Sequence, residues 1–274
     1  MTGWPFADLA LSRRLERAEA ASNARFVEAR ARVDPSAAAA WIEVAGAYAM
    51  FDGVDSPLTQ TFGLGLFGDT GDRELARLEA FFDGRGAAVH HEVSPLAGVE
   101  LAARLARRGY VPEEFTTVLC RPLGGSPDGD TTPAGGVAVE PLPDGQAGLF
   151  GDVAARGWAE FPEVAPFVAD LSAVFAHHAA ARCYLAVVDG VPAGTGVLTM
   201  HEGVAVLAGA STVPEARCRG AQRALLAARL ADAAAAGCDL AMIATAPGSA
   251  SQRNAERRGF RIAYTRAKWF LARG

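Results

Sequence analysis

The sequence has few cysteines and no excess of positive charge. Its four cysteines, spread over 274 residues, form no C-x-x-C pair, which argues against a disulfide framework or a zinc site and predicts a reduced, cytoplasmic protein. The formal net charge is -5. Because nucleic acids and anionic membranes attract a basic surface, we expect neither as a partner.

Long hydrophobic runs are absent as well. No stretch of eighteen consecutive apolar residues occurs, whereas a helix that crosses a bilayer needs about twenty. The first residues also lack the charged start and apolar core of a signal peptide. We therefore expect no membrane span and no secretion signal, although 50% of the residues are hydrophobic, enough to bury a sizeable core.

One segment in the middle of the chain is almost free of apolar side chains. Residues 122–136, PLGGSPDGDTTPAGG, contain five glycines and three prolines, a composition typical of a linker. We predict a first domain at 1–121, a linker at 122–136 and a second domain at 137–274.

The two halves resemble each other near their ends. Each contains a strand, a proline-containing loop, a helix, the motif R-R-G-aromatic and a further strand. The motifs are Arg107-Arg108-Gly109-Tyr110 and Arg257-Arg258-Gly259-Phe260, 150 residues apart. The glycine suits the left-handed residue that ends a helix, and the aromatic side chain can pack back on the core. The repeated order predicts an internal duplication.

Helices and strands alternate along the second half. We expect helices at about 145–158, 164–180, 219–236 and 249–258, a hairpin that turns at Asp189-Gly190, and strands at 204–212 and 260–270. The first half should begin with an amphipathic helix near Asp8. This order predicts an α/β fold with helices on both faces of a mixed sheet.

The stretch STVPEARCRGAQRALLAARL (211–230) leads from a strand into an alanine-rich helix and places Arg217, Arg219 and Gly220 at the junction. A helix N-terminus has unpaired N–H groups and a partial positive charge, which attract phosphate. The arginines add charge-assisted hydrogen bonds, Gly220 lets a phosphate approach the backbone, and Gln222 can donate from the first turn. The alternative is a helix start with solvated arginines, but cations there oppose the helix dipole. We therefore predict a pyrophosphate site, although it is neither a P-loop nor a G-x-G-x-x-G motif.

Two segments resemble a known family. VPEARCRGAQRALL resembles the R/Q-x-x-G-x-G/A acyl-CoA loop of the GNAT superfamily of N-acyltransferases, and SQRNAERRGF resembles that superfamily's next helix and closing Gly-Phe. The resemblance covers about residues 137–270 and is looser in the first half. It implies a tandem protein of two GNAT-like α/β domains, each a mixed, mostly antiparallel sheet with helices on both faces, the N-terminal one degenerate.

The resemblance also implies a site for acetyl-CoA as co-substrate. The loop around the pyrophosphate would consist of Arg217, Cys218, Arg219, Gly220, Ala221 and Gln222. Thr212 and Val213 would meet the pantetheine arm through backbone groups, and a backbone N–H there would polarise the thioester carbonyl. Ser251 and Asn254 would contact the cofactor from the next helix. Gln222 departs from the family, which usually has Gly or Ala at its position.

The implied reaction is direct attack of an amine on the acetyl thioester. Many family members protonate the leaving thiolate with a Tyr, but this sequence has Ala255 at that position, and Gly248 replaces the usual Asn seven residues earlier. Tyr264 is the nearest replacement, or else an ordinary aromatic residue on a strand. Ser251 either relays a proton through water or caps its helix. Cys218 lies beside arginines, which favour a reactive thiol, but the reaction needs no such nucleophile.

Candidate bases lie in GWAEFPEV (157–164), between two helices, where the family places its acceptor site. Glu160 or Glu163 would bind the ammonium form of an amine and accept its proton, and Trp158 and Phe161 would supply apolar walls. The alternative is a pair of solvated glutamates and two core aromatics. The acceptor would be a small-molecule or peptide amine.

No metal is expected, because the adjacent histidines His90 and His91 in a strand point to opposite faces.

In the first half, Asp69 and Asp72 surround Gly71 at the position that corresponds to the arginine loop. Carboxylates repel a pyrophosphate but suit an ordinary helix start. We expect the first half to have kept the fold and lost the cofactor, which gives a monomer with an internal pseudo-dimer, or a homodimer.

Two other functions stay open at this point. The missing Tyr favours an acyl-CoA-binding pseudoenzyme or sensor without turnover. A purely structural or protein-interaction module is the third possibility, and binding of acetyl-CoA would exclude it.

Overall fold

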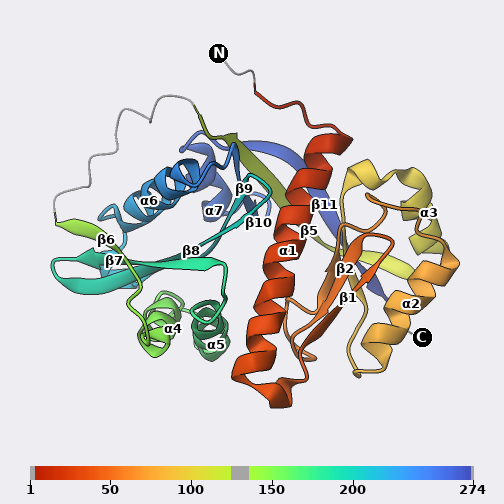
Figure 1. The fold of residues 1–274 in the computed structure, drawn as a ribbon, viewed down its shortest axis with the longest axis horizontal. Coiled ribbons are helices and arrows are strands. Elements are labelled where there is room, and N and C mark those ends of the chain that lie inside the picture. Colours follow the sequence, from red (N-terminus) through yellow and green to blue (C-terminus); the bar gives the residue numbers. More distant parts are fainter. Residues whose placement is uncertain (1–3, 125–135, 273–274) are drawn as a thin grey trace. The chain divides into compact units, whose positions relative to one another are not determined.

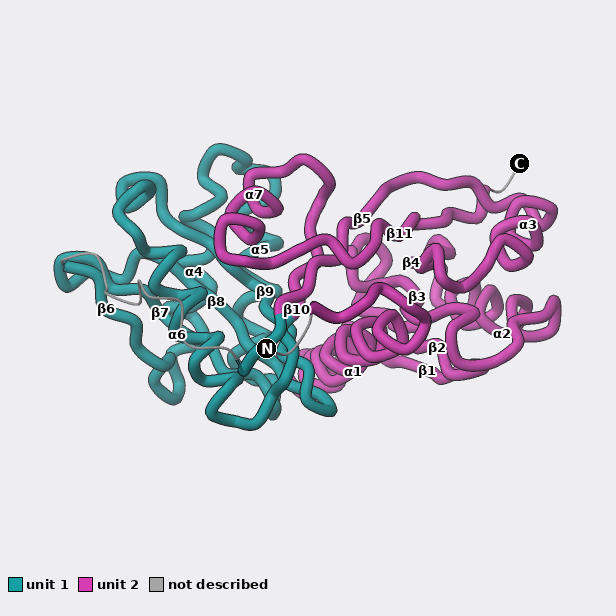
Figure 2. Tube along the Cα trace, turned by 90° about the horizontal axis from the view of Figure 1, so that it is seen from above, with its two compact units in different colours: residues 1–2, 122–241 teal, residues 3–121, 242–274 magenta. Residues whose placement is uncertain are grey.

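The computed structural model describes residues 4–124 and 136–272, so most of the predicted linker lies outside the described residues. The chain forms two compact units (Figure 2). Unit 1 contains residues 122–241, and unit 2 contains residues 3–121 together with 242–274. The end of the second half therefore belongs to the same compact unit as the first half. The domains predicted at 1–121 and 137–274 are therefore not the same as these two compact units, and they stay a prediction.

The described residues of unit 1 form four antiparallel strands and three α-helices. The strands are β6 (Val137–Pro141), β7 (Ala181–Val188), β8 (Val191–His201) and β9 (Val204–Thr212), and the helices are α4 (Ala147–Arg156), α5 (Ala165–Phe175) and α6 (Ala221–Ala235). Strand β10 (Leu240–Thr245) runs across the boundary between the units.

The sheet of unit 1 is covered on both faces. Its strands are ordered β6-β7-β8-β9, with α6 on one face and the neighbouring helices α4 and α5 on the other (Figure 1). The β7–β8 hairpin turns at Asp189 and Gly190, both with positive φ, as the Asp-Gly pair predicts. The predicted layers of this half are confirmed.

Unit 2 begins with a long helix whose N-cap is Asp8, which accepts a hydrogen bond from the Leu11 N–H at 2.9 Å. Its helices are α1 (Leu9–Val33), α2 (Asp72–Asp83), α3 (Val99–Arg107) and α7 (Ala250–Glu256). Its strands are β1 (Ala40–Val44), β2 (Ala47–Phe51), β3 (Gln60–Phe62), β4 (His90–Val93), β5 (Tyr110–Pro122) and β11 (Arg261–Leu271). None of the helices in the described residues is long and apolar enough to span a bilayer.

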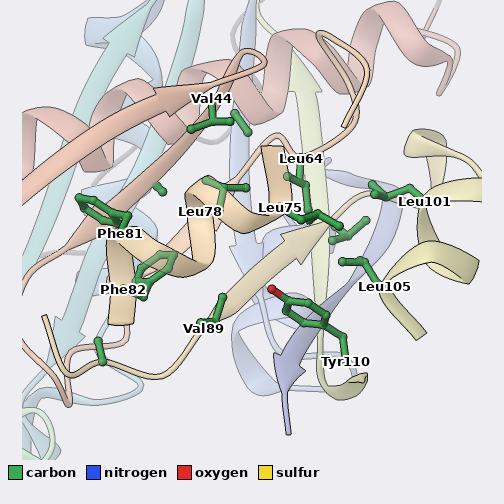
Figure 3. Close-up of a cluster of buried hydrophobic side chains, with 14 of the residues drawn as sticks. Val44, Leu64, Leu75, Leu78, Phe81, Phe82, Val89, Leu101, Leu105 and Tyr110 are labelled. Atoms are coloured by element: carbon green, nitrogen blue, oxygen red, sulfur yellow. The ribbon is translucent and has the colours of Figure 1, made fainter. Parts of the chain in front are cut away.

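The alternation of side chains along β2 builds two cores in unit 2. Ala47, Ala49 and Phe51 belong to the larger cluster, which surrounds α2 (Figure 3), whereas Met50 and its partly buried neighbour Tyr48 pack on the other face with α1. Successive side chains of a strand point to opposite faces. The sheet of unit 2 therefore also has helices on both faces.

Strands β5 and β11, the last strands of the two halves, pair with each other antiparallel. Their register is consistent with the 150-residue repeat of the R-R-G-aromatic motif, because the pairs map onto one another when residues 150 apart are exchanged. Val111 pairs with Phe270, and Arg261, which corresponds to Val111, pairs with Cys120, which corresponds to Phe270. The pairing is thus symmetric under exchange of the two halves.

The centre of this symmetry lies at the pair Thr116–Arg266, because these two residues correspond to each other and also face each other. Even the irregularities are symmetric: a register shift occurs between Ile262 and Tyr264 at one end and between Lys268 and Trp269 at the other. A local two-fold axis between equivalent strands is what a duplicated domain would leave. β11 also pairs with β4, so it lies inside the sheet of unit 2.

Arg266 joins β11 to α1 through buried charge. Its side chain is 2% exposed, and its Nη1 lies 2.6 Å from Glu19 Oε2 and 3.2 Å from Glu16 Oε1. Its Nε lies 2.9 Å from Glu92 Oε2. Burial raises the pKa of Glu16 above its usual value, and the nearby guanidinium opposes that rise. Three carboxylates therefore depend on one cation for their burial.

Candidate functional site

Strand β9 has a bulge where it pairs with β8. The register pairs on either side are Thr195 with Ser211 and Val197 with Ala208. β9 has one residue more than β8 between these pairs, and the exposed residues Gly209 and Ala210 lie there, with Gly209 at φ +58°. Bulges with a left-handed glycine redirect the backbone and are common beside active sites. The sequence analysis missed this feature, for which the glycine inside the strand was the signal.

The loop after β9 leads to the N-terminus of α6, where Gly220 is the N-cap residue in a left-handed conformation, φ +92°. That conformation favours glycine independently of any ligand. Arg217, Cys218 and Arg219 precede it and are all exposed, and the first turn of α6 contains no acidic residue. The structure thus places two exposed arginines at a helix N-terminus whose first turn has no acidic residue, as predicted.

Both arginines are held by exposed carboxylates. Arg217 Nη1 lies 2.9 Å from Glu160 Oε2, and its Nη2 donates to the Gly157 carbonyl at 3.1 Å. Arg219 pairs with Asp189 at the β7–β8 turn. These four side chains are 39–62% exposed, and such pairs contribute only about 0–1 kcal/mol. A more highly charged anion can therefore replace the carboxylates.

The start of α6 is tied to the end of β9. Gln222 Nε2 donates to Thr212 Oγ1 at 2.8 Å, and Ala221 is buried. The N–H of Val213 donates to the Ala193 carbonyl at 2.9 Å. This amide is therefore bonded within the fold, and the exposed residues near the strand end, Gly209 and Ala210, lie a few residues earlier, at the bulge.

Ser251 and Asn254 lie on α7 in unit 2, and both are exposed. The N-cap of α7 is Ser249, whose hydroxyl accepts from the Gln252 N–H at 3.1 Å. The alternative that Ser251 caps this helix is therefore wrong. Its contact with a cofactor stays a prediction.

Tyr264 is buried in unit 2 and donates its hydroxyl to Glu16 Oε1 at 2.9 Å. Burial and the neighbouring carboxyl group of Glu16 raise the pKa of Tyr264 well above 10. These contacts favour an aromatic residue that packs on a strand, and they lend no support to its assignment as the acid.

The segment 157–164 connects α4 to α5 and exposes its aromatic side chains. Trp158 and Phe161 are 41% and 50% exposed, with ring centroids 6.1 Å apart. The alternative that both are core residues is therefore wrong. Glu163 is exposed, and Glu160 is paired with Arg217. The segment 157–164 is thus linked to the arginine loop within unit 1 by an ion pair.

The corresponding helix start in the first half is filled by its own acidic side chains. Glu74 Oε2 accepts from the Gly71 N–H at 3.1 Å, and Asp72 Oδ1 lies 3.6 Å from Arg108 Nη1. This is an ordinary capped helix start, as the sequence predicts. A hollow of about 500 Å³ beside it is lined by Asp72 with Arg104, Arg107 and Arg108. The sequence analysis did not predict these arginines at this position.

A hollow of about 680 Å³ in unit 1 contains none of the loop residues. Three of its polar side chains satisfy one another: Asp232 accepts from Arg182 and from Tyr184. Burial and this carboxylate raise the pKa of Tyr184 to about 12. Over the described ranges, no group of three or more His, Cys, Asp or Glu side chains is placed to hold a metal.

Comparison with known proteins agrees with this geometry. Residues 152–260 match the model of the acetyltransferase (GNAT) family. This part of the chain is a GNAT domain. The matched segment contains the bulge, the arginine loop, α6 and the whole segment 157–164. A search of curated protein sequences finds no match.

Solved structures share the fold over most of the chain. A GCN5-related N-acetyltransferase from Kribbella flavida is 18% identical and has a TM-score of 0.60, with 92% of this chain and 96% of that chain covered. A tandem GNAT protein from the clavulanic acid biosynthesis pathway is 15% identical, with a TM-score of 0.58 and coverage of 83% and 79%. A GCN5-related N-acetyltransferase from Sphaerobacter thermophilus is 16% identical, with a TM-score of 0.55 and coverage of 83% and 78%. The GNAT fold therefore extends well beyond the matched domain.

Proposed function

We propose that this protein transfers an acetyl group from acetyl-CoA to an amine by direct attack, with one acetyl-CoA site per chain. The observation that carries the proposal is the β9–α6 loop of the GNAT domain, where the exposed Arg217 and Arg219 precede the left-handed N-cap Gly220. Backbone N–H groups, the helix dipole and two guanidinium groups then act together on the pyrophosphate. Thr212, Ser251 and Asn254 remain our candidates for further cofactor contacts.

The acceptor would bind beside the segment 157–164. Trp158 and Phe161 offer exposed apolar surface, and Glu160 or Glu163 would attract a cationic amine and accept its proton. The ion pair between Glu160 and Arg217 couples the two ligands. When a pyrophosphate binds Arg217 in place of Glu160, the Glu160 carboxylate becomes available for the amine. We therefore expect acetyl-CoA to bind before the amine.

We propose further that the first half is a degenerate GNAT-like domain without acetyl-CoA. The symmetric pairing of β5 and β11 supports a duplication, and Glu74 and Asp72 occupy the start of α2. The chain would then be a monomer that contains its own pseudo-dimer, with a homodimer as the alternative. All four cysteines are free, as expected for the cytoplasmic location that we propose.

Calorimetry with acetyl-CoA, followed by release of coenzyme A in the presence of a panel of amines, tests the proposal. We expect one site per chain and turnover with at least one amine. Binding without turnover would favour the pseudoenzyme or sensor, and absence of binding would leave the interaction module. Two equivalent sites would refute the proposal of a single site per chain.

A pair of matched variants locates the site. Gly220→Glu places a side chain and a negative charge where the pyrophosphate should lie, and it also strains a left-handed residue. We expect a loss of several kcal/mol of binding free energy, which corresponds to one or two charge-assisted hydrogen bonds plus repulsion. Asp72→Arg in the first half is the control and should leave the affinity nearly unchanged. Wild-type affinity in a folded Gly220→Glu protein would exclude the loop.

A further inference from the structure

Arg229, in the middle of α6, is buried and hydrogen-bonded only to backbone in the contacts described. Its side chain is 3% exposed. Its Nε donates to the Leu225 carbonyl at 3.1 Å, and its Nη1 donates to the carbonyls of Val197 and Ala208, each at 3.1 Å. Burial lowers the pKa of Arg229 to about 10, which still leaves it charged at neutral pH. Burial of a cation is expensive, so this placement calls for an explanation.

The opposing strand makes room for this guanidinium. A Cβ atom at Gly196 would lie 2.9 Å from Arg229 Cζ and 3.0 Å from its Nε. Contacts this short do not occur without a shift of one group. β8 therefore lacks a side chain at the position where Arg229 approaches the bulge, and Gly196 and Arg229 form a matched pair.

A second buried donor acts on the next peptide of the bulge. Thr195 is fully buried, and its Oγ1 donates to the Gly209 carbonyl at 3.0 Å. Two consecutive carbonyls, those of Ala208 and Gly209, are thus bound by buried side chains. The C=O and N–H of a trans peptide point in opposite directions. The N–H groups of Gly209 and Ala210 therefore point away from Arg229 and Thr195, and both residues are exposed.

The same hydrogen bonds also change the donor strength of these amides. A donor bound to a carbonyl polarises the peptide and strengthens its N–H as a donor, and the effect is larger when the donor is a cation. Gly220 and Arg229 lie nine residues apart on α6, which is about 13 Å along a helix axis. One helix therefore carries both the phosphate loop and the side chain that holds the bulge.

We infer that Arg229 is a positioning residue for acetyl transfer, which with Thr195 orients the bulge peptides so that the N–H of Gly209 or Ala210 donates to the thioester carbonyl of acetyl-CoA. This inference deepens the proposed function and rests on it. Arg229 itself touches no reacting atom. The bond that forms joins the amine nitrogen to the acetyl carbon, and the amine gives up its proton to Glu160 or Glu163 of the proposed function. The bond that breaks joins that carbon to sulfur, and its electron pair leaves with coenzyme A as the thiolate. The negative charge that develops on the carbonyl oxygen in between is what the amide stabilises.

The variant Arg229→Met separates this role from a merely structural one. Methionine has a similar length without charge, and replacing a buried ion by an apolar group often leaves stability intact. The phosphate loop is unaltered, so the Kd of coenzyme A should stay within about two-fold of wild type. We expect the carbonyl stretch of bound ¹³C-labelled acetyl-CoA to return toward its value in water. We expect kcat to fall by about 10²-fold with little change in the KM for acetyl-CoA.

Two further variants complete the experiment. Gly196→Ala should displace the guanidinium and give the same spectral shift, so it replaces Arg229→Met if that protein does not fold. Arg182→Met, which removes an exposed arginine of the same unit, is the control and should change neither the stretch nor kcat. A wild-type stretch in folded Arg229→Met protein overturns the inference. So does a parallel loss of coenzyme A affinity, which indicates a structural role.

The inference and the proposed function can fail separately. If wild-type protein binds acetyl-CoA but turns over no amine, the acyltransferase proposal fails, while the carbonyl stretch still decides whether Arg229 orients the amide that polarises the thioester. If wild-type protein does not bind acetyl-CoA, both are overturned. If turnover is present and Arg229→Met retains it in full, only the inference is refuted.

Discussion

Replacement of Arg266 by Met should destabilise unit 2 strongly. The guanidinium lies 2.6 Å from Glu19, 2.9 Å from Glu92 and 3.2 Å from Glu16. Removal of one partner from a buried ion pair costs about 3–5 kcal/mol because the other charge stays buried without compensation. Three carboxylates lose the same cation here, so we expect the upper part of that range at pH 8. The unfolding temperature should fall by about 10 °C or more.

The effect should depend on pH through Glu16. Burial raises the pKa of Glu16 above its usual 4.5, and Arg266 lowers it, so loss of Arg266 raises this pKa further. A carboxyl group whose pKa is higher in the folded than in the unfolded state stabilises the folded state. This stabilisation is fully present at pH values below the unfolded pKa. This contribution is lost as the pH rises through the folded pKa. The stability difference between Arg266→Met and wild type should therefore grow as the pH rises above 4.5.

Denaturant unfolding at pH 5.5 and pH 8, followed by tryptophan fluorescence, measures this difference. Trp41 and Trp269 lie on β1 and β11 and report on unit 2. Arg182→Met is the control, because loss of an exposed pair should change stability by less than about 1 kcal/mol. Adding Glu16→Gln to Arg266→Met should recover part of the stability at pH 8. A loss below about 1 kcal/mol at pH 8, or a loss independent of pH, would refute the argument.

Three other changes test the site and the fold. Asp189→Asn frees Arg219 from its ion pair and should tighten acetyl-CoA binding by about two- to five-fold in calorimetry, in line with the small strength of exposed pairs; weaker binding would argue against Arg219 as a phosphate ligand. Glu160→Gln should lower kcat by about 10²-fold while acetyl-CoA binds at least as tightly, and wild-type turnover would remove Glu160 as the base. The fragment 1–121 lacks β11, which lies between β4 and β5, so it should fold only when co-expressed with 137–274; cooperative unfolding of the isolated fragment would contradict this pairing.

Local sequence determined most elements of unit 1 and the form of the arginine loop. The Asp189-Gly190 pair adopts the two left-handed residues of a tight hairpin turn, and the helix expected at 219–236 spans Ala221–Ala235. The sequence around Arg217, Arg219 and Gly220 was enough to predict an anion site, because the N-terminus of a helix is a local feature. The glycine in VAVLAGAST also carried the signal for the bulge, although it was not interpreted.

Tertiary structure alone decided which strands meet and which polar groups become buried. Periodicity identifies the apolar face of a strand but not its partner, because pairing depends on contacts between residues far apart in sequence. β11 therefore joined the sheet of the first half, with Arg266 and Tyr264 on Glu16, 250 and 248 residues away. From the sequence alone, Arg229 would be predicted to be a surface cation on an alanine-rich helix. Only the packing of α6 on β8 and β9, across the space left by Gly196, places its charge on the carbonyls of the bulge.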